Sequence, residues 1–419
     1  MPRRGSASRR CSIPASPCAT DRGEAMNDVY VVAATRTPVG RARGVLRQVR
    51  ADDLLIAAMR GALRQVPSLD PAAIEDVVMG CAMPEGEQGL NVARSAALLA
   101  GVPVHAGGMT VNRFCASGLS AIQIAADRIR VGAADVMLAG GVESMSRIPM
   151  GGFHPAPHPD LFLSRDNEGL AYGMGLTAEN VAQQWNVTRE DQDAYALQSH
   201  QRALAAQQSG AFAQEITPLT VPHRTPLGES GEVAVHEALV EADEGPRADT
   251  SLQALSQLRP AFKAKGSVTA GNSSQMSDGA ACLVLASAEA VKSHGLHPLA
   301  RIVDFSVRGV APEIMGIGPA KTVPSLLQRT GVSLQDIDWI ELNEAFAAQV
   351  LAVQRLLGFD AARLNPVGGA IALGHPLGAS GAIRVATLVH GLRRTSGRYG
   401  LVTLCVGMGQ GIAGLFERV

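Results

Sequence analysis

The stretch Val111-Asn-Arg-Phe-Cys-Ala-Ser-Gly-Leu-Ser-Ala-Ile122 joins a strand, a turn and a helix. A short apolar strand ends at its beginning, the turn carries Cys115, and the apolar face of the helix includes Leu119 and Ile122. Cys115 thus lies at a helix N-terminus, where unpaired backbone N–H groups and the helix dipole favour a thiolate over a thiol. The stretch predicts a strand–turn–helix unit of an α/β fold that presents a nucleophile with a lowered pKa.

Such a nucleophile needs a base, and two later turns supply candidates. His375 lies between Gly374 and Pro376 in a glycine-rich loop. Cys405 lies where the apolar run 401–406 gives way to glycines. A thiol activated by an imidazole is a recurrent arrangement in covalent catalysis, so the three residues together indicate an enzyme.

Length, composition and charge limit the fold classes and ligands that this chain can have. A chain of 419 residues exceeds the size at which one core stops growing, so two or three domains are expected. Hydrophobic residues make up 46% and aromatic residues only 4%, with 45 glycines, which is typical of packed α/β layers and argues against an all-β or disordered chain. The 37 basic and 38 acidic residues produce no field that would attract nucleic acid or an anionic membrane.

The six cysteines have neither the spacing of a disulfide framework nor that of a zinc site, so we expect no metal and a reducing compartment. The longest uncharged stretches are too rich in glycine to cross a membrane, and the C-terminal Glu-Arg-Val is not a peroxisomal signal. We therefore expect a cytoplasmic protein without a membrane span.

Residues 1–25 are rich in Arg, Ser and Pro and contain no acidic residue before Asp21. Organelle transit peptides have this composition. The alternative, which we favour, is a disordered or misassigned N-terminal extension, with the protein proper beginning at Met26.

Two parts of the chain follow the same order of elements, which is strand, helix, strand, active turn, helix and buried strand. The first copy occupies 74–79, 91–99, 109–111, the Cys115 turn, the helix after it and 135–139. The second occupies 337–342, 345–357, 368–370, the His375 turn, 379–392 and 401–406. Each is a βαβαβ unit, so the two turns are expected at equivalent strand ends.

Between these copies, residues 145–265 form an insert with turn-rich pieces, a helix that opens at Thr188-x-x-Asp191, and a polar region from 218 to 249. We predict one half formed by 26–144 plus 266–297, an inserted loop domain at 145–265 that covers the substrate, and a second half at 298–419.

Four motifs resemble those of the thiolases, in the same order and at similar distances. They are N-R-F-C-A-S-G at 112–118, N-E-A-F at 343–346, G-G-A-I-A-L-G-H-P-L-G-A-S-G at 368–381 and C-V-G-M-G-Q-G at 405–411. The resemblance extends from Met26 to Val419, and the C-terminal end is most similar to the 3-ketoacyl-CoA thiolases (acetyl-CoA C-acyltransferases) of fatty-acid β-oxidation. It implies the thiolase fold, in which two βαβαβ-type halves form a layered α/β/α/β/α core with an inserted loop domain.

The resemblance also implies roles in cleaving a 3-ketoacyl-CoA. Cys115 would attack the ketone carbon, His375 would accept the thiol proton, and Cys405 would protonate the departing acetyl-CoA enolate. His375, with a water held by Asn343, would serve the thioester oxygen during enolate chemistry as one oxyanion site. The backbone N–H groups of Cys115 and Gly407 would form the other.

Further residues are assigned to CoA by looser matches: Met174, Arg247, Leu258, Phe262, Ala270, Ser274, Met315 and Phe346. Coenzyme A is then a substrate, and no cofactor is expected. Gly173 and Ala254 depart from the histidine and serine of some members, which leaves the acyl group undefined. By resemblance the protein is a homodimer or homotetramer, with a β-oxidation hydratase or dehydrogenase as a possible partner.

Other interpretations remain open. A condensing ketosynthase resembles this chain but has a second histidine where Cys405 stands. A thiolase-like lipid carrier without catalysis and a biosynthetic acetoacetyl-CoA thiolase are further alternatives. Taken singly, Cys81 and Cys282 are expected to be small buried hydrophobes, and Glu143 and Glu344 to be structural carboxylates.

Overall fold

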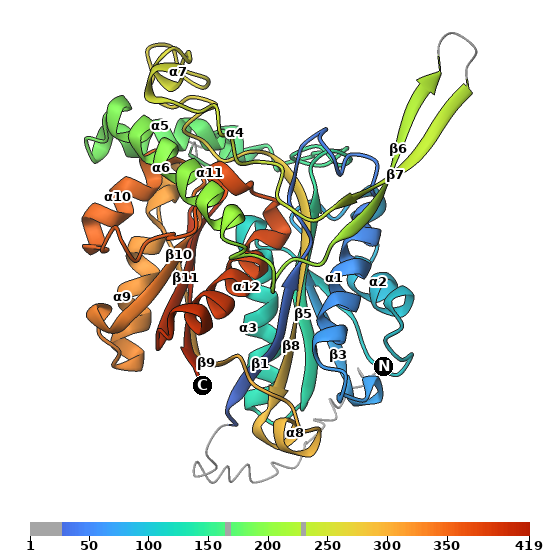
Figure 1. Cartoon of the computed structure of the whole chain (residues 1–419). Helices are drawn as coiled ribbons and strands as arrows, with labels where there is room; N and C mark the ends of the chain where they lie inside the picture. Colours follow the sequence, from blue (N-terminus) through green and yellow to red (C-terminus); the bar gives the residue numbers. More distant parts are fainter. Residues whose placement is uncertain (1–26, 164–168, 228–231) are drawn as a thin grey trace, which may run out of the picture.

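The structure, a computed structural model, describes residues 27–163, 169–227 and 232–419 (Figure 1). The predicted extension at 1–25 lies outside the described residues. No helix within the described ranges is long and apolar enough to cross a membrane.

The strands form two groups, one in each half of the chain. The first group has the order β1 (Val29–Arg36), β8 (Ser277–Ser287), β5 (Val136–Ser144), β3 (Asp76–Gly80) and β4 (Met109–Val111), with β2 (Gly40–Arg41) paired to β8. The second has the order β9 (Ala300–Gly309), β12 (Gln410–Arg418), β11 (Tyr399–Val406) and β10 (Ile337–Leu342). β1 pairs with β9, so hydrogen bonds join the two groups into one continuous sheet.

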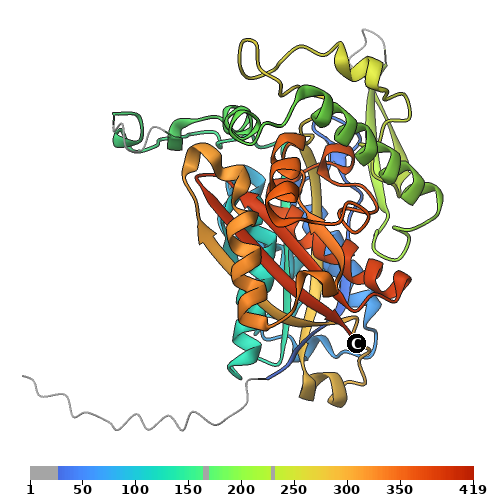
Figure 2. The ribbon, with the colours of Figure 1, turned by 90° about the vertical axis from the view of Figure 1, so that its left-hand side faces the viewer.

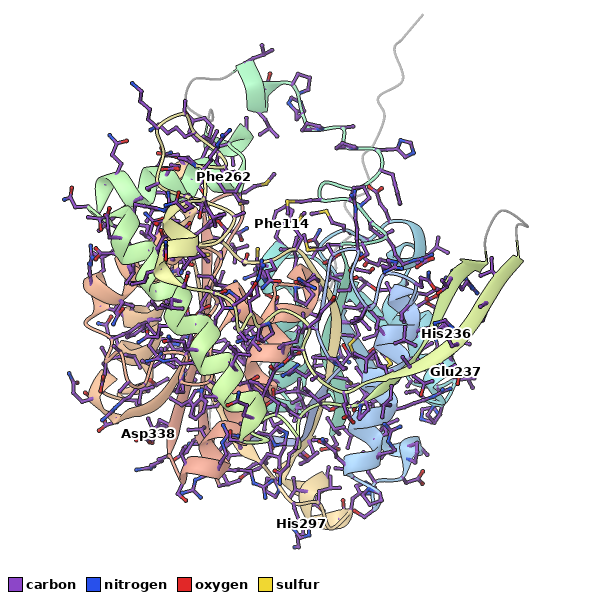
Figure 3. All side chains as sticks on the ribbon, turned by 45° about the horizontal axis from the view of Figure 1, so that its top comes forward. Phe114, His236, Glu237, Phe262, His297 and Asp338 are labelled. Carbon is purple, nitrogen blue, oxygen red and sulfur yellow. The ribbon has the colours of Figure 1, made fainter. Side chains whose placement is uncertain are left out.

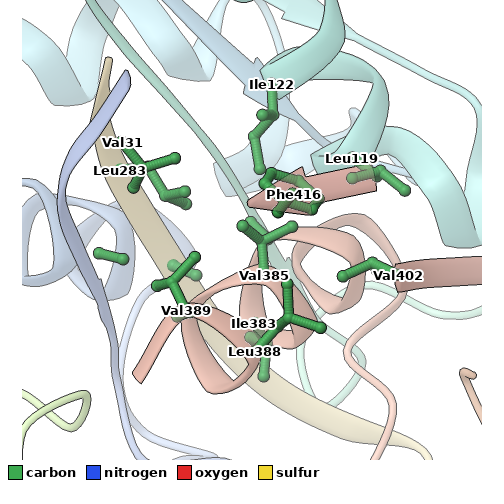
Figure 4. Close-up of a cluster of buried hydrophobic side chains, with 14 of the residues drawn as sticks. Val31, Leu119, Ile122, Leu283, Ile383, Val385, Leu388, Val389, Val402 and Phe416 are labelled. Carbon is green, nitrogen blue, oxygen red and sulfur yellow. The ribbon is translucent and has the colours of Figure 1, made fainter. Parts of the chain in front are cut away.

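Two helices lie between the halves, α3 (Ser117–Arg130) and α12 (Leu377–Thr395) (Figure 1). α12 is buried from Leu377 to Leu392, because strands and α3 surround it. Leu119 and Ile122 of α3 pack in one cluster with Val385 and Val389 of α12 and with Phe416 (Figure 4). The core of the protein is therefore this central helical layer with the sheet faces on both sides.

Outer helices complete the layers. α1 (Ala51–Gln65) and α2 (Val92–Ala100) cover the first half, and α9 (Pro319–Thr330) and α10 (Ala347–Leu357) cover the second. Figure 2 shows α9 lying over the strands of the second half. The predicted α/β/α/β/α order of layers is confirmed.

The expected repeat is present in part. The strand predicted at 368–370 is wrong, because this segment is a loop that leads into a short helix, and Gly368 has a φ of +80°, which a strand does not adopt. β3 runs parallel to β4 and β5 in the first half, and β10 runs parallel to β11 in the second. α3 follows the Cys115 turn and α12 follows the His375 turn, with the short α11 (Ala370–Leu373) before the latter. β12 was not predicted, because its sequence begins in the glycine run that we assigned to the active turn.

The insert contains α4 (Asp160–Leu163), α5 (Met174–Gln184), α6 (Arg189–Gln208), β6 (Leu219–Leu227), β7 (Glu232–Val240) and α7 (Leu252–Ser256), and α8 (Ala288–Ser293) follows β8. The predicted helix start is confirmed, since the Thr188 hydroxyl accepts a hydrogen bond from the Asp191 N–H at 3.1 Å. No element was predicted for the polar region from 218 to 249, where β6 and β7 pair as a hairpin that projects from the body (Figure 1). The domain boundaries stay a prediction.

Candidate active site

A tight turn presents Cys115 between β4 and α3. The Asn112 side-chain oxygen accepts a hydrogen bond from the Phe114 N–H at 2.8 Å, and the Ser117 hydroxyl accepts one from the Arg113 N–H at 2.9 Å. Phe114 has a φ of +45°, which is a strained conformation for an aromatic residue. These local bonds maintain the strain and place the thiol at the start of α3.

Backbone conformation and hydrogen bonds also fix the turn that carries His375. Gly374 has a φ of +100°, and a Cβ there would lie 2.3 Å from the Ser277 hydroxyl, so the position requires glycine. The His375 N–H donates to the Gln275 carbonyl at 3.0 Å and approaches the Ser277 hydroxyl at 3.1 Å. β8 and the segment before it therefore fix the backbone of the imidazole.

The His375 side chain is buried and has a polar neighbour at each ring nitrogen. Nδ1 lies 2.5 Å from the Ser380 hydroxyl, and Nε2 lies 3.3 Å from the Asn343 side-chain nitrogen. Burial, with a contribution from the positive charge of Arg384, lowers the His375 pKa to about 3. The imidazole is therefore neutral at physiological pH, as a base that accepts a thiol proton must be.

The thiol of Cys115 does not have the lowered pKa that its position at a helix N-terminus predicted. Burial raises the Cys115 pKa to about 11, and hydrogen bonds from the backbone N–H groups of Gly407 and of Cys115 itself offset only part of that effect. The prediction was wrong because the turn is covered by the second half of the chain, which local sequence does not reveal. Cys115 rests as a thiol and needs its base.

Cys405 lies at the end of β11 and is buried. Burial raises the Cys405 pKa, and a thiolate on nearby Cys115 would raise it further. The Gly407 N–H donates to the Cys115 thiol, and Asn343 approaches His375. The turn at 114–116 contacts α12, which begins two residues after His375. The catalytic roles of these five residues stay predictions.

Apolar side chains line the site around Cys405. Met174, Met315 and Phe346 pack with it in one cluster, and the Phe262 ring meets Phe346 edge to face at 6.0 Å between centroids. Figure 3 shows Phe262 and Phe114 at the same end of the molecule, far from Asp338 and His297. Met174, Met315, Phe346 and Phe262, which are assigned to CoA by resemblance, form an apolar surface beside Cys405.

Other residues assigned to CoA lie farther out. Arg247, Leu258 and Ala270 line a cleft of about 240 Å³ between the insert and the core. The Ser274 N–H donates to the Ala345 carbonyl at 2.9 Å, beside Phe346. The assigned residues thus fall into a group at the thiols and a group in the outer cleft.

His200 lines the same cleft and was missed in the sequence, since it lies in the middle of α6 without a motif around it. Its Nδ1 accepts a hydrogen bond from the Arg247 N–H at 3.1 Å, and burial followed by the Arg247 charge lowers its pKa to about 4. Neutral His200 therefore fixes the backbone of Arg247, whose exposed guanidinium also lies 3.5 Å from Asp249.

Glu143 and Glu344 are structural carboxylates, as predicted. Glu143 accepts hydrogen bonds from the N–H groups of Ala82, Met83 and Gly378 and from the Gln88 amide. Glu344 accepts from the Tyr195 and Ser199 hydroxyls, the Asn365 amide and the Ile371 N–H. The first ties β5 to the start of α12, and the second ties α6 to the loop before His375.

Cys81 and Cys282 are fully buried in the hydrophobic core of the first half, which confirms their prediction as packing residues. No group of His, Cys, Asp and Glu able to hold a metal ion occurs in the described part of the chain.

Two family models match this chain, the thiolase N-terminal domain over residues 29–289 and the thiolase C-terminal domain over 296–418. The chain belongs to the thiolase family. It is 46% identical to a 3-ketoacyl-CoA thiolase of Bacillus subtilis, over 94% of this chain and 100% of that protein. It is 47% identical to a β-ketoadipyl-CoA thiolase of Pseudomonas putida, again over 94% and 100%.

Among solved structures, human mitochondrial 3-ketoacyl-CoA thiolase superposes with a TM-score of 0.85 at 40% identity, covering 94% of this thiolase and 100% of the human chain. The predicted family and fold are confirmed, and the protein is a thiolase-family acyltransferase. Some relatives are named for 3-ketoacyl-CoA and others for β-ketoadipyl-CoA, so their names do not define the acyl group of the substrate.

Proposed function

We propose that this thiolase cleaves 3-ketoacyl-CoA with CoA to give acetyl-CoA and a shortened acyl-CoA. The observation that carries the proposal is a buried, neutral imidazole, His375, in the turn equivalent to that of the Cys115 thiol, with a second buried thiol, Cys405, near Cys115. Cys115 rests as a thiol, so its attack on the ketone carbon has to be coupled to proton transfer to His375.

The remaining steps use the second thiol. Collapse of the adduct breaks the bond between C2 and C3 and expels the acetyl-CoA enolate, which Cys405 protonates at C2. The incoming CoA then gives its proton to the Cys405 thiolate and attacks the acyl group on Cys115, and His375 returns the first proton to the leaving sulfur. The N–H groups of Gly407 and Cys115 stabilise the acyl oxyanion.

The apolar surroundings of Cys405 favour an aliphatic acyl group. Met174, Met315 and Phe346, assigned to CoA by resemblance, pack with Cys405 in one apolar cluster, which suits an uncharged acyl chain beside the thiols. We therefore place the enzyme in the degradative branch that acts on fatty acyl chains. The second candidate is a 3-oxoadipyl-CoA thiolase, which the name of the Pseudomonas putida relative favours, and the third is a biosynthetic enzyme that condenses two acetyl-CoA.

Thiolysis rates distinguish these candidates. The decrease of 3-ketoacyl-CoA absorbance with CoA is measured for acetoacetyl-CoA, 3-ketohexanoyl-CoA, 3-ketodecanoyl-CoA and 3-oxoadipyl-CoA, with Cys115→Ser as the inactive control. We expect the highest kcat/KM for a longer aliphatic substrate. A preference for 3-oxoadipyl-CoA would contradict the aliphatic assignment, and activity on acetoacetyl-CoA alone would favour the biosynthetic enzyme.

We further propose that the enzyme works in the cytoplasm as a homodimer or homotetramer, beside a β-oxidation hydratase or dehydrogenase. CoA serves only as a substrate. Light scattering during size-exclusion chromatography tests the assembly, and a monomer would contradict it.

A further inference from the structure

Ser380 lies one turn into α12, and its side chain faces back towards His375. It is buried, its hydroxyl lies 2.5 Å from His375 Nδ1, and it donates to the Pro376 carbonyl at 2.9 Å. Nothing in the proposed chemistry uses it, so its place against the catalytic imidazole calls for an explanation.

The donors and acceptors around Nδ1 of His375 indicate where the hydrogens lie on that side of the ring. A serine hydroxyl carries one hydrogen, and the Pro376 carbonyl, which can only accept, takes it. A lone pair of the Ser380 oxygen then faces Nδ1. That contact is a hydrogen bond only when Nδ1 carries a hydrogen, so Nε2 of the neutral ring is left bare.

The other side of the ring supports the same state. The Asn343 side-chain nitrogen lies 3.3 Å from Nε2 and can only donate, which requires a bare Nε2. If Nε2 carried the hydrogen, it would need the Asn343 side-chain oxygen as its acceptor. The Asn343 amide would then have to rotate by half a turn, which would place its NH2 group where the oxygen now lies. That oxygen is buried and has no hydrogen-bond partner among the described residues, so turning the amide would leave two N–H donors unpaired there instead of one acceptor.

We propose that Ser380 is a positioning residue that fixes His375 in the tautomer protonated at Nδ1, so that Nε2 is held as the base for the Cys115 thiol. The proposal rests on the proposed function. A serine in this place differs from the carboxylate that orients histidine in many hydrolases, because a neutral hydroxyl orients the ring without stabilising the imidazolium. The resting site thus keeps a neutral base ready to receive a proton.

The direct test is nuclear magnetic resonance of enzyme labelled with 15N histidine, because ring 15N shifts distinguish protonated from bare nitrogens. The His375 signals are assigned by their loss in His375→Asn. We expect Nδ1 protonated and Nε2 bare in the wild type, and a mixture of tautomers in Ser380→Ala. A wild-type ring protonated at Nε2, or an unchanged tautomer in Ser380→Ala, would overturn the proposal.

Kinetics supply the second readout, with Ser120→Ala as the matched control. Ser120 is a buried serine on the neighbouring helix α3, and its hydroxyl has no hydrogen-bond partner in the described ranges. We expect kcat of Ser380→Ala to fall about tenfold, the factor for losing one net hydrogen bond, while KM is unchanged because Ser380 does not touch substrate. Equal losses in Ser120→Ala and Ser380→Ala would show a packing effect and refute the proposal.

The two claims can fail separately. If the wild type cleaves none of the 3-ketoacyl-CoA substrates, the proposed function fails, yet the tautomer measurement in the free enzyme still decides the role of Ser380. If thiolysis proceeds normally in both serine variants, the function stands and the positioning role is wrong.

Discussion

Replacing Cys405 with alanine should separate two steps of the reaction. Cys405 is the proposed acid that protonates the enolate, and its raised pKa keeps the proton on sulfur until a carbanion forms. In Cys405→Ala, exchange of the acetyl-CoA methyl protons with solvent should stop. Transfer of an acetyl group from acetyl-CoA onto Cys115 should continue at least in part, since it depends on His375.

The magnitudes follow from the surroundings of the thiol. Cys405 is 1% exposed and packs against Met315 and Phe346, so losing one buried atom costs about 1 kcal/mol of the free energy of unfolding. General acid–base catalysis contributes roughly 10²–10⁴-fold, so turnover should fall by at least about a hundredfold. A loss of activity this large cannot come from so small a loss of stability.

The assay follows deuterium incorporation into acetyl-CoA in deuterated water, alongside mass spectrometry of the acetylated Cys115 peptide. Cys282→Ala is the matched control, because Cys282 is an equally buried cysteine in β8 away from the site. Exchange at the wild-type rate in Cys405→Ala would make Cys405 a packing residue and refute the assignment of the acid.

Four further substitutions test other parts of the structure. Cys115→Ser should fold normally but carry no acetyl adduct after mixing with acetoacetyl-CoA, and an adduct on another cysteine of the wild type would contradict the assignment. Gly407→Ala should keep its melting temperature, because the added Cβ would meet Met174 only at an ordinary contact distance of 3.7 Å. Its thiolysis rate should fall about 10²-fold, because the Cβ would crowd the proposed oxyanion site. Gly374→Ala should instead lower the melting temperature sharply, because its Cβ would lie 2.3 Å from the Ser277 hydroxyl. Burial raises the Glu341 pKa in the folded state from 4.5 to about 7, so the folded state binds the carboxyl proton more tightly than the unfolded state. The free energy of unfolding therefore falls as pH rises from 4.5 to about 7. Glu341→Gln should therefore gain melting temperature relative to the wild type at pH 8 compared with pH 5, and equal differences at both pH values would argue against a raised pKa.

The sequence was sufficient to predict both active turns, because glycines and reactive side chains mark them at equivalent points of a repeat. The turn of Cys115 and the helix that follows the His375 turn are in contact. The same local reasoning failed for the Cys115 pKa, since burial by the second half of the chain outweighs the N–H groups of the turn. The pairing of β12 with the remote β9 also has no strong local signal. The hairpin of β6 and β7 was missed because its strands contain proline and charged residues, which are depleted in strands.

Ser380 shows a different limit of sequence reasoning. It stands within the G-H-P-L-G-A-S-G motif, but its spacing from His375 suggests a contact only once α12 is known to begin at Leu377. The helix start brings the hydroxyl back over the imidazole, and the Pro376 carbonyl then decides which partner donates. A signal was present in the sequence, although its meaning depended on the geometry of the first turn.

The electrostatics of the site fit chemistry in which charge exists only briefly. Both thiols and the imidazole rest neutral, since burial disfavours the charged form of each. The nearby ionisable groups already have partners: Arg384 pairs with Glu341 at 3.2 Å, and Glu143 is enclosed by N–H donors. An enolate or oxyanion formed here would meet backbone N–H groups and transferable protons rather than a fixed cation that would bind it too tightly to react onward. In the proposed reaction this arrangement would let one site break and form a carbon–carbon bond, with the direction set by the supply of CoA.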